Sequence, residues 1–173
     1  LNPSMRIDKQ MIEGIRLHTP LTKAEARKKS ADILSQVGIP DPQRVLKNYP
    51  HQLSGGMSQR VMIAMAMSCE PDLLIADEPT GNLDPDTAWE IMQLLDQINK
   101  RGTTILMVTH AKDIVDKMGK RVIAIEKGRI VRDEFGLYGY AEALEGVEST
   151  FDTIQSARTF RSKSRFRRGG REE

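Results

Sequence analysis

Two short apolar segments with a helical segment between them constrain the fold of this chain more than any other feature of its sequence. Residues 73–77 (LLIAD) and 103–109 (TTILMVT) are mainly apolar runs, typical of strands that are buried on both faces of a sheet. The stretch between them, residues 84–102, begins at an Asp-Pro pair and ends at a glycine, as helices do. Its helical face is marked by Trp89, Met92, Leu95 and Ile98. This strand–helix–strand order predicts an α/β fold with a parallel sheet.

Residues 1–71 predict a helical subdomain ahead of this sheet. The apolar face of a first helix consists of Ile7, Met11 and Ile15. Thr22 and Glu25 have the spacing of a capping box and open a second helix, which Gly38 ends as a C-cap. The positions of this second helix that are expected to face inward are Ala26, Ile33, Leu34 and Val37.

Residues 72–134 are expected to form the α/β core, which closes with a hairpin. After a short helix at 113–118, two segments with strand character follow at 121–126 and 129–134. The two residues between them, Lys127-Gly128, are typical of a tight turn that joins antiparallel strands. The core is therefore expected to end in a β-hairpin.

Residues 135–173 form a C-terminal extension that is strongly basic from about residue 156. Residues 156–173 hold seven basic and two acidic residues, a net charge of +5, which leaves −3 for residues 1–155 within the total of +2. The segment has no apolar periodicity and is predicted to be disordered. A solvated extension is the simpler interpretation, and attraction to anionic lipids or nucleic acid is the alternative.

Length and composition exclude several classes of protein. The 173 residues suit one domain, and a single cysteine excludes an internal disulfide framework and a Cys-rich zinc site. No apolar run approaches the roughly 18 residues of a membrane span, and the chain does not open with a secretory signal pattern. The expected class is a soluble cytosolic domain. Because the chain opens at Leu1 rather than at Met, it is also expected to be the later part of a longer protein.

The segment LSGGMSQR at 53–60 is the strongest single candidate for ligand binding. Ser54, Gly55 and Gly56 stand directly before a helix rich in Met and Ala. Backbone N–H groups at a helix start, unobstructed by Cβ atoms and aided by the helix dipole, favour an anion such as phosphate. The same three residues also occur in ordinary loops and caps, so this segment alone leaves both interpretations open.

Polar residues follow both predicted strands. Asp77 and Glu78 close the first and His110 closes the second, so the three side chains are expected near one edge of the sheet, where α/β proteins bind ligands. One carboxylate can hold Mg²⁺ while its neighbour deprotonates a water molecule. The alternatives are a loop-capping acidic pair and a structural histidine. For Asp84, which stands before Pro85, the simpler interpretation is an N-cap.

Taken together, these segments resemble the ATP-hydrolysing domain of ABC (ATP-binding cassette) proteins, a P-loop NTPase fold. LSGGMSQR resembles the family's signature motif, LLIADEPT its Walker B segment, GNLD its D-loop and VTH its switch-histidine strand. Residues 1–80 resemble dipeptide and oligopeptide importer ATPases, whereas residues 81–134 resemble the cell-division ABC ATPase. The sequence is therefore either a natural hybrid or a chimaera joined at the shared ADEPT stretch, and the chimaera is favoured.

The resemblance implies a role for each motif residue. Asp77 would serve Mg²⁺, Glu78 would act as the general base on water, and His110 would contact the γ-phosphate of ATP. Residues of the signature motif would bind ATP held by a second ABC subunit, and Asp84 would lie at the interface of this head-to-tail dimer. The signature residues are Ser54, Gly55, Gly56 and Gln59. An integral-membrane transporter subunit would be the further partner, which places the chain in the cytoplasm, peripheral on the inner face of the membrane.

The resemblance also identifies a missing element. No G-x-x-x-x-G-K-[ST] phosphate loop (Walker A) occurs in the sequence. The chain is therefore expected to be truncated at its N-terminus and inactive alone, although the family hydrolyses ATP. Without partner strands, apolar surface on the 73–77 and 103–109 strands is expected to be exposed.

Three classes of function compete on this sequence. The first is the ATPase subunit of a transporter or cell-division complex, and the second is a non-catalytic remnant that offers only its signature face to another subunit. The third, an ABC ATPase of DNA repair or chromosome maintenance, is disfavoured because zinc-binding cysteine sets and long heptad coiled coils are absent from the sequence. Nucleic acid is therefore disfavoured as a partner.

Overall fold

The computed structural model describes residues 1–135, and these fall into two compact units that divide between Ala111 and Lys112. The predicted tail at 156–173 lies outside the described residues. The first unit contains α1 (Ile7–His18), α2 (Lys23–Gln36), α3 (Pro42–Lys47), the 3₁₀ turn η1 (Pro50–Gln52), α4 (Gly55–Met67), β1 (Leu73–Asp77), α5 (Pro85–Lys100) and β2 (Thr104–Val108). The second contains α6 (Lys112–Met118), β3 (Arg121–Glu126) and β4 (Arg129–Phe135).

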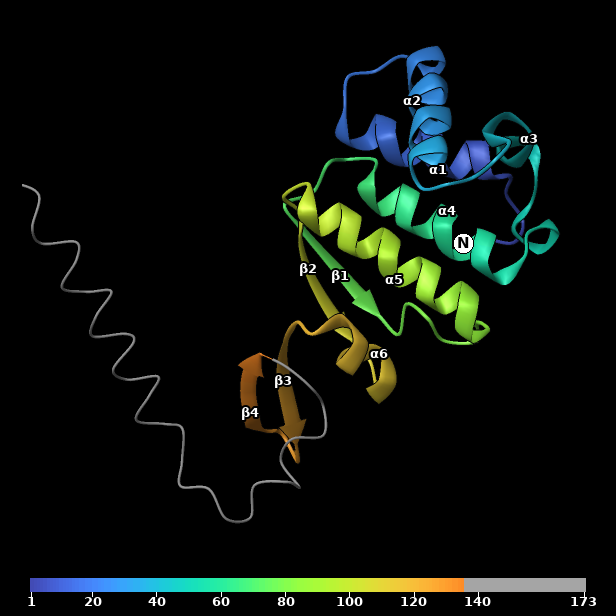
Figure 1. Ribbon diagram of the computed structural model, residues 1–173. Helices are drawn as coiled ribbons and strands as arrows, with labels where there is room; N and C mark the ends of the chain where they lie inside the picture. The colour runs from blue at the N-terminus through green and yellow to red at the C-terminus, as the bar shows by residue number, and fades with distance from the viewer. Residues whose placement is uncertain (136–173) are drawn as a thin grey trace, which may run out of the picture. The chain divides into compact units, whose positions relative to one another are not determined.

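The predicted strand–helix–strand unit is present. β1 and β2 pair in parallel, with Leu73 opposite Thr104 and Asp77 opposite Val108. Helix α5 connects the two strands and packs against β2, while α4 runs beside α5 (Figure 1). Because both strands run in the same direction, their carboxyl ends lie at one edge of the sheet. The fold is α/β, as the sequence predicts.

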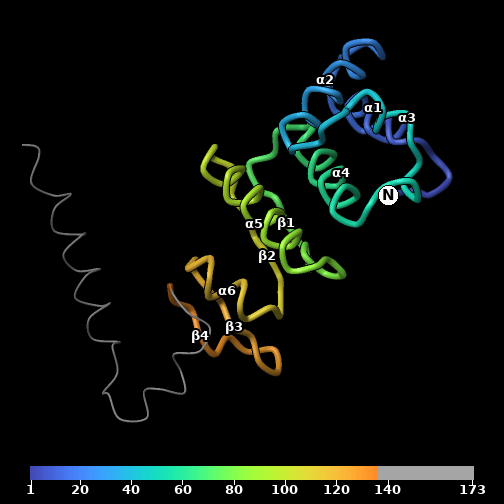
Figure 2. Tube along the Cα trace, turned by 45° about the vertical axis from the view of Figure 1, so that its right-hand side comes forward, coloured from blue at the N-terminus to red at the C-terminus, as the bar shows by residue number. Residues whose placement is uncertain are grey.

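Helices α1 to α3 form the predicted helical subdomain. Helix α2 contacts α1, α3 and α4. Helices α1, α2 and α3 lie together on the side of α4 away from the sheet (Figure 2). The capping box is present, with the Thr22 hydroxyl accepting from the Glu25 N–H at 3.3 Å and a Glu25 carboxylate oxygen accepting from the Thr22 N–H at 2.8 Å. Gly38 follows the helix with φ at +82°, which suits a glycine. The predicted core positions of both helices are all buried: Ile7, Met11, Ile15, Ala26, Ile33, Leu34 and Val37.

The second unit confirms the predicted hairpin. β3 and β4 pair antiparallel, and Lys127 and Gly128 between them have φ of 47° and 76°. Positive φ at both central residues is the conformation of a tight turn that matches the twist of a hairpin. None of the helices within residues 1–135 combines the length and apolar composition that crossing a membrane requires.

Burial of the two parallel strands on both faces is a wrong prediction. Leu74 is only 8% exposed, but its neighbours Leu73 and Ile75 are 51% and 64% exposed, and in β2 Leu106 and Val108 are 50% and 54% exposed. Successive side chains of a strand point to opposite faces, so this alternation means that one face is covered and the other is open within the described chain. The companion expectation, exposed apolar surface on these strands, is confirmed.

Candidate functional site

The carboxyl edge of the parallel sheet brings the predicted strand-end residues together. Beyond the last paired residues, the Glu78 N–H donates to the Val108 carbonyl at 2.9 Å, which extends the β1–β2 ladder by one step. Thr109 and His110 directly follow β2, so they face the residue that directly follows β1. The parallel pairing therefore places Glu78 beside Thr109 and His110, although about thirty residues of sequence separate them.

The Glu78 carboxylate is the centre of this group. Its Oε1 accepts a hydrogen bond from the His110 backbone N–H at 3.1 Å and lies 2.7 Å from Nδ1 of the His110 ring. Its Oε2 accepts a hydrogen bond from the Thr109 hydroxyl at 3.3 Å. A carboxylate has roughly four acceptor positions, so one remains for a water molecule or a substrate group. The prediction that Glu78 and His110 lie at the same edge is confirmed.

These donors keep Glu78 ionised. The pKa of Glu78 lies below its usual range, mainly because of the hydrogen bond with the His110 side chain. The hydrogen bond from Thr109 acts in the same direction, whereas partial desolvation opposes it. Glu78 also has a left-handed backbone, with φ at 45°, a conformation that costs a residue other than glycine about 1–2 kcal/mol. The chain thus holds a carboxylate in a fixed position, at some cost in backbone energy.

Asp77 is the last residue of β1 and is exposed. Because successive strand residues alternate, its carboxylate is directed to the face opposite that of Ala76, away from the covered side. Carboxylate oxygen is the ligand type that Mg²⁺ prefers, and Mg²⁺ in nucleotide enzymes is held by one or two carboxylates together with substrate phosphates. Residues 1–135 contain no cluster of three or more His, Cys, Asp or Glu that could hold a metal by themselves. Asp77 thus offers one carboxylate of the type that Mg²⁺ binds, and its role as a Mg²⁺ ligand stays a prediction.

The first turn of α4 contains the predicted phosphate-binding segment. Ser54 is the N-cap, and its hydroxyl accepts from the Met57 N–H at 3.3 Å. Gly55 and Gly56 are the first two helical residues, and Gln59 lies half-buried one turn further on. The N-cap is thus confirmed, and phosphate binding stays a prediction, which the cap does not oppose because a capped helix start still presents backbone N–H groups at the positive end of its dipole. We call residues 54–56 the signature turn.

The loop at 81–84 lies against the signature turn. Asp84 is the N-cap of α5: its carboxylate accepts from the Thr87 N–H at 2.9 Å, and hydrogen bonding at Thr87 lowers the pKa of Asp84. A Cβ added at Gly55 would lie 3.1 Å from the Leu83 side chain, so the loop and the turn are in van der Waals contact. We call residues 81–84 the D-loop segment. The starts of α4 and α5 thus lie at the same end of the unit.

Two contributing residues were not singled out from the sequence. Thr109 holds Glu78 and, through the same hydroxyl, accepts from the Ala111 N–H at 3.2 Å. Its position directly before the strand-end histidine is the signal that could have identified it. Thr87, on the first turn of α5, lies against Gly56, and nothing in its sequence position indicates that contact.

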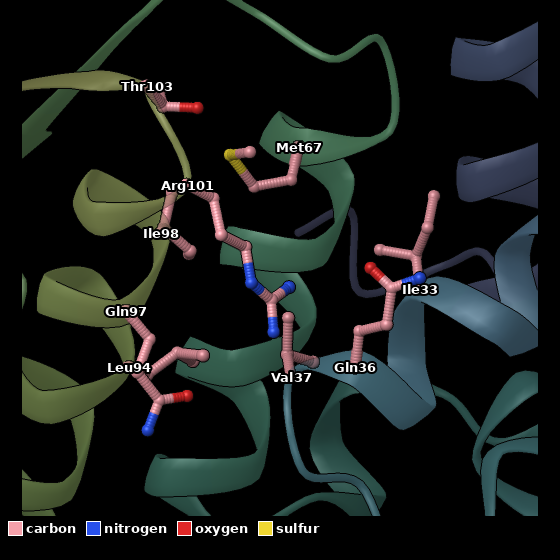
Figure 3. Close-up of a pocket in the computed structure, with 9 residues that line it drawn as sticks. All are labelled: Ile33, Gln36, Val37, Met67, Leu94, Gln97, Ile98, Arg101 and Thr103. Atoms are coloured by element: carbon pink, nitrogen blue, oxygen red, sulfur yellow. The ribbon is translucent and has the colours of Figure 1, made fainter.

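A small pocket at the other end of α4 and α5 does not belong to this site (Figure 3). Its volume is about 50 Å³, enough for water but far below the roughly 300–1,000 Å³ of sites for small organic ligands. Met67 closes α4 there and Thr103 precedes β2, which is the opposite end of the strand from His110. The residues that line it are Ile33, Gln36, Val37, Met67, Leu94, Gln97, Ile98, Arg101 and Thr103. The candidate site is therefore the open sheet edge rather than an enclosed cavity.

Comparison with known proteins supports the resemblance seen in the motifs. A family model described as ABC transporter matches residues 1–81. The cell division ATP-binding protein FtsE of Bacillus subtilis (strain 168) is 55% identical over 114 residues, which cover 65% of this chain and 49% of that protein. The dipeptide transport ATP-binding protein DppD of Escherichia coli (strain K12) is 45% identical over 132 residues, 76% of this chain and 40% of that protein. The relatives thus include both a cell-division ATPase and a peptide transport protein, the two kinds that the sequence resembles.

Solved structures give the same assignment of fold. A dimeric post-hydrolysis state of the ATP-binding cassette MJ0796, bound to ADP and Pi, matches with a TM-score of 0.67 and 32% identity over 78% of this chain and 58% of that chain. The ABC transporter protein cbiO1 of Clostridium perfringens matches with a TM-score of 0.65 and 33% identity, covering 76% of this chain and 51% of that one. The chain is homologous to the ATP-binding subunits of ABC transporters, has part of the ABC-type P-loop NTPase fold, and spans about half the length, or less, of the curated relatives it matches.

Proposed function

We propose that this chain is the part of an ABC-type ATPase subunit that carries the catalytic base, the Mg²⁺ carboxylate and the signature turn. The observation that carries the proposal is the Glu78–His110 pair, 2.7 Å apart at the carboxyl edge of the parallel sheet. Homology to ATP-binding proteins of ABC transporters supports it, as does the anion-favouring start of α4. The reaction is hydrolysis of ATP to ADP and phosphate.

In this proposal Glu78 is the general base. It is ionised at neutral pH, His110 and Thr109 hold it by hydrogen bonds, and its remaining acceptor position receives a proton from the attacking water. His110 is 91% exposed, so its ring is accessible to the γ-phosphate. Asp77 would hold Mg²⁺, which stabilises the charge that spreads over the phosphate oxygens when it is bound.

The signature turn acts in trans. Ser54, Gly55 and Gly56 offer backbone and hydroxyl groups to the γ-phosphate of an ATP bound by a second ABC subunit, and Gln59 completes this surface. Asp84 belongs to the D-loop segment, whose Leu83 contacts the turn, and lies at the interface of the resulting head-to-tail dimer. An integral-membrane transporter subunit is the partner that the dimer drives, so the protein works at the cytoplasmic face of the membrane. Because the relatives include a cell division protein and a dipeptide transport protein, the process that this chain serves is either peptide transport or cell division.

The principal test is a protein in which the phosphate-loop region of a relative precedes Leu1. In this fusion, Glu78→Gln should lower ATP turnover about 10²–10⁴-fold, the usual contribution of a general base, while Mg-ATP affinity is kept. The matched control is Glu70→Gln, an exposed carboxylate paired with Lys29, which should leave turnover unchanged. Full turnover with Glu78→Gln would refute the role of this residue.

A second candidate function is a non-catalytic chain that presents only its signature turn to a complete ABC subunit. The absence of a phosphate-loop sequence from the 173 residues favours it for this chain alone, which we expect to bind Mg-ATP weakly and to show no turnover. Calorimetry with Mg-ATP tests this expectation directly. Micromolar affinity of the isolated chain would contradict it.

A further inference from the structure

Helix α4 opens on two glycines of which neither has the backbone conformation that normally requires glycine. Gly55 and Gly56 are absent from the positions with positive φ, whereas Gly38, Gly102, Gly119 and Gly128 are among them. Glycine inside a helix is less stable than alanine by up to about 1 kcal/mol, so alanine would be the more stable residue at both positions unless a neighbouring group obstructs its Cβ. The constraint lies in what surrounds each glycine.

The neighbour of Gly56 is a side chain of the next helix. A Cβ built on Gly56 would lie 2.6 Å from Cγ2 of Thr87, closer than real Cβ atoms approach another atom. Its distance of 3.9 Å from Cβ of Thr87 would be an ordinary contact. The contact at Gly55 is softer, since the nearest atom is the end of the Leu83 side chain at 3.1 Å, which can move. The severe restriction therefore comes from one methyl group.

That methyl group is held in place. Thr87 is in the first turn of α5, and its N–H donates to the Asp84 carboxylate at 2.9 Å, which fixes the backbone beneath it. Threonine in a helix has two favoured χ1 rotamers, so the methyl group can leave this position only by a change to the other rotamer. Asp84 and Leu83 belong to the D-loop segment, so the same short stretch both fixes Thr87 and contacts Gly55.

We propose that Thr87 is the positioning residue of the signature turn: its methyl group packs on Gly56 and sets the distance between the signature turn and the D-loop segment. The two loops then meet a second subunit as one body. This inference rests on the proposed function for the identity of that partner. It assigns the need for glycine at position 56 to contact within the chain, while the backbone N–H of that residue stays available to phosphate.

The first experiment is a double-mutant cycle on thermal unfolding of the full 173-residue chain. Gly56→Ala should lower the Tm by roughly 3–8 °C, the effect of overpacking. In the Thr87→Ser background, where the methyl group is gone but the hydroxyl and the helix cap remain, the same Gly56→Ala change should raise the Tm by about 1–4 °C. Gly14→Ala in α1, with no atom within 4 Å of the added Cβ, is the control and should also raise it. An equal loss from Gly56→Ala in both backgrounds would overturn the packing claim.

The second experiment reads out position rather than stability. Labelled chain is titrated with full-length FtsE of Bacillus subtilis in the presence of Mg²⁺ and a non-hydrolysable ATP analogue, with fluorescence anisotropy as the readout. Gly56→Ala should weaken association about tenfold or more, and adding Thr87→Ser should restore it. Weak association of a double variant whose Tm is restored would mean that the partner's phosphate alone requires the glycine, and would overturn the inference. Failure of the parent chain to associate would instead refute action in trans, and the thermal cycle would still decide the packing.

Discussion

Arg60 links three helices of the first unit, and its removal is the most informative perturbation of the fold. From α4, its Nη1 donates to the Val37 carbonyl at the end of α2 at 2.7 Å, and its Nη2 donates to the Glu90 carboxylate of α5 at 2.8 Å. The guanidinium also occupies the space beside Gly38, where a Cβ would lie 2.9 Å from Nη1. One side chain thus joins the helical subdomain to the α/β core.

The two bonds differ in strength. The Arg60 side chain is only 18% exposed, so a charged hydrogen bond to the Val37 carbonyl is worth about 1.5–3 kcal/mol. Glu90 is 61% exposed, and an ion pair in that setting is worth about 0.2–1 kcal/mol. Arg60→Ala should therefore destabilise the unit by about 2–4 kcal/mol. Glu90→Gln should cost less than about 1 kcal/mol.

Urea unfolding followed by the fluorescence of Trp89, the only tryptophan, measures both variants. With an m-value of about 2 kcal/mol/M, Arg60→Ala should lower the midpoint by about 1–2 M and Glu90→Gln by less than about 0.5 M. Arg60→Lys should fall between them, because an ammonium group lacks the fork that reaches two partners. Lys100→Gln, which removes a helix i,i+4 pair at 2.7 Å between the exposed Lys100 and the half-buried Asp96, is the control and should shift the midpoint by about 0.2 M.

Equal midpoint shifts for Arg60→Ala and Glu90→Gln would refute this reasoning, because the ion pair rather than the carbonyl bond would then carry the effect. A shift below about 0.3 M for Arg60→Ala would show that the bond to Val37 contributes nothing net.

Three further predictions address capping, pH and the open sheet face. Asp84→Ala should destabilise the chain by about 1 kcal/mol, whereas Asp84→Asn, which keeps an N-cap acceptor, should be nearly neutral in urea unfolding. The pKa of Glu25 is lowered, chiefly by its hydrogen bond with the Thr22 side chain, so its contribution to stability is present above its unfolded pKa of about 4.3 and is lost as pH falls through the folded value. Amide protection factors of α2, which correct for the pH dependence of intrinsic exchange, should fall over that range, and Glu25→Gln should remove the dependence. Ile75→Lys and Leu106→Lys, at exposed positions, should each change stability by less than about 0.5 kcal/mol and should reduce self-association in analytical ultracentrifugation; a large loss of stability would mean that the face is covered.

Local signals predicted the elements of the fold with high fidelity. The capping box at Thr22, the Asp84-Pro85 helix start and the Lys127-Gly128 turn act through backbone groups within four residues, so their structural consequences could be derived from sequence alone. Burial of the strands could not be derived in the same way. An apolar run fixes strand character, but exposure depends on what covers each face, and Ile75 and Leu106 remain half or more exposed.

In the candidate site, too, the sequence identified the residues and the structure showed their contacts. Sequence motifs identified Glu78 and His110 and placed both at strand ends, but the hydrogen bond from Thr109 follows from the parallel register of β1 and β2. The packing of Thr87 on Gly56 likewise joins residues thirty-one positions apart and leaves no local signal.

By itself, then, the sequence determined the order of helices and strands, the position of the helix caps and the motif residues, because these depend on near neighbours and on residue type. The tertiary structure decided which side chains meet: Arg60 with Val37, Glu78 with Thr109 and Thr87 with Gly56. It also decided which strand face stays open. These contacts join distant segments, and their geometry follows from helix packing and strand register, which no local pattern encodes.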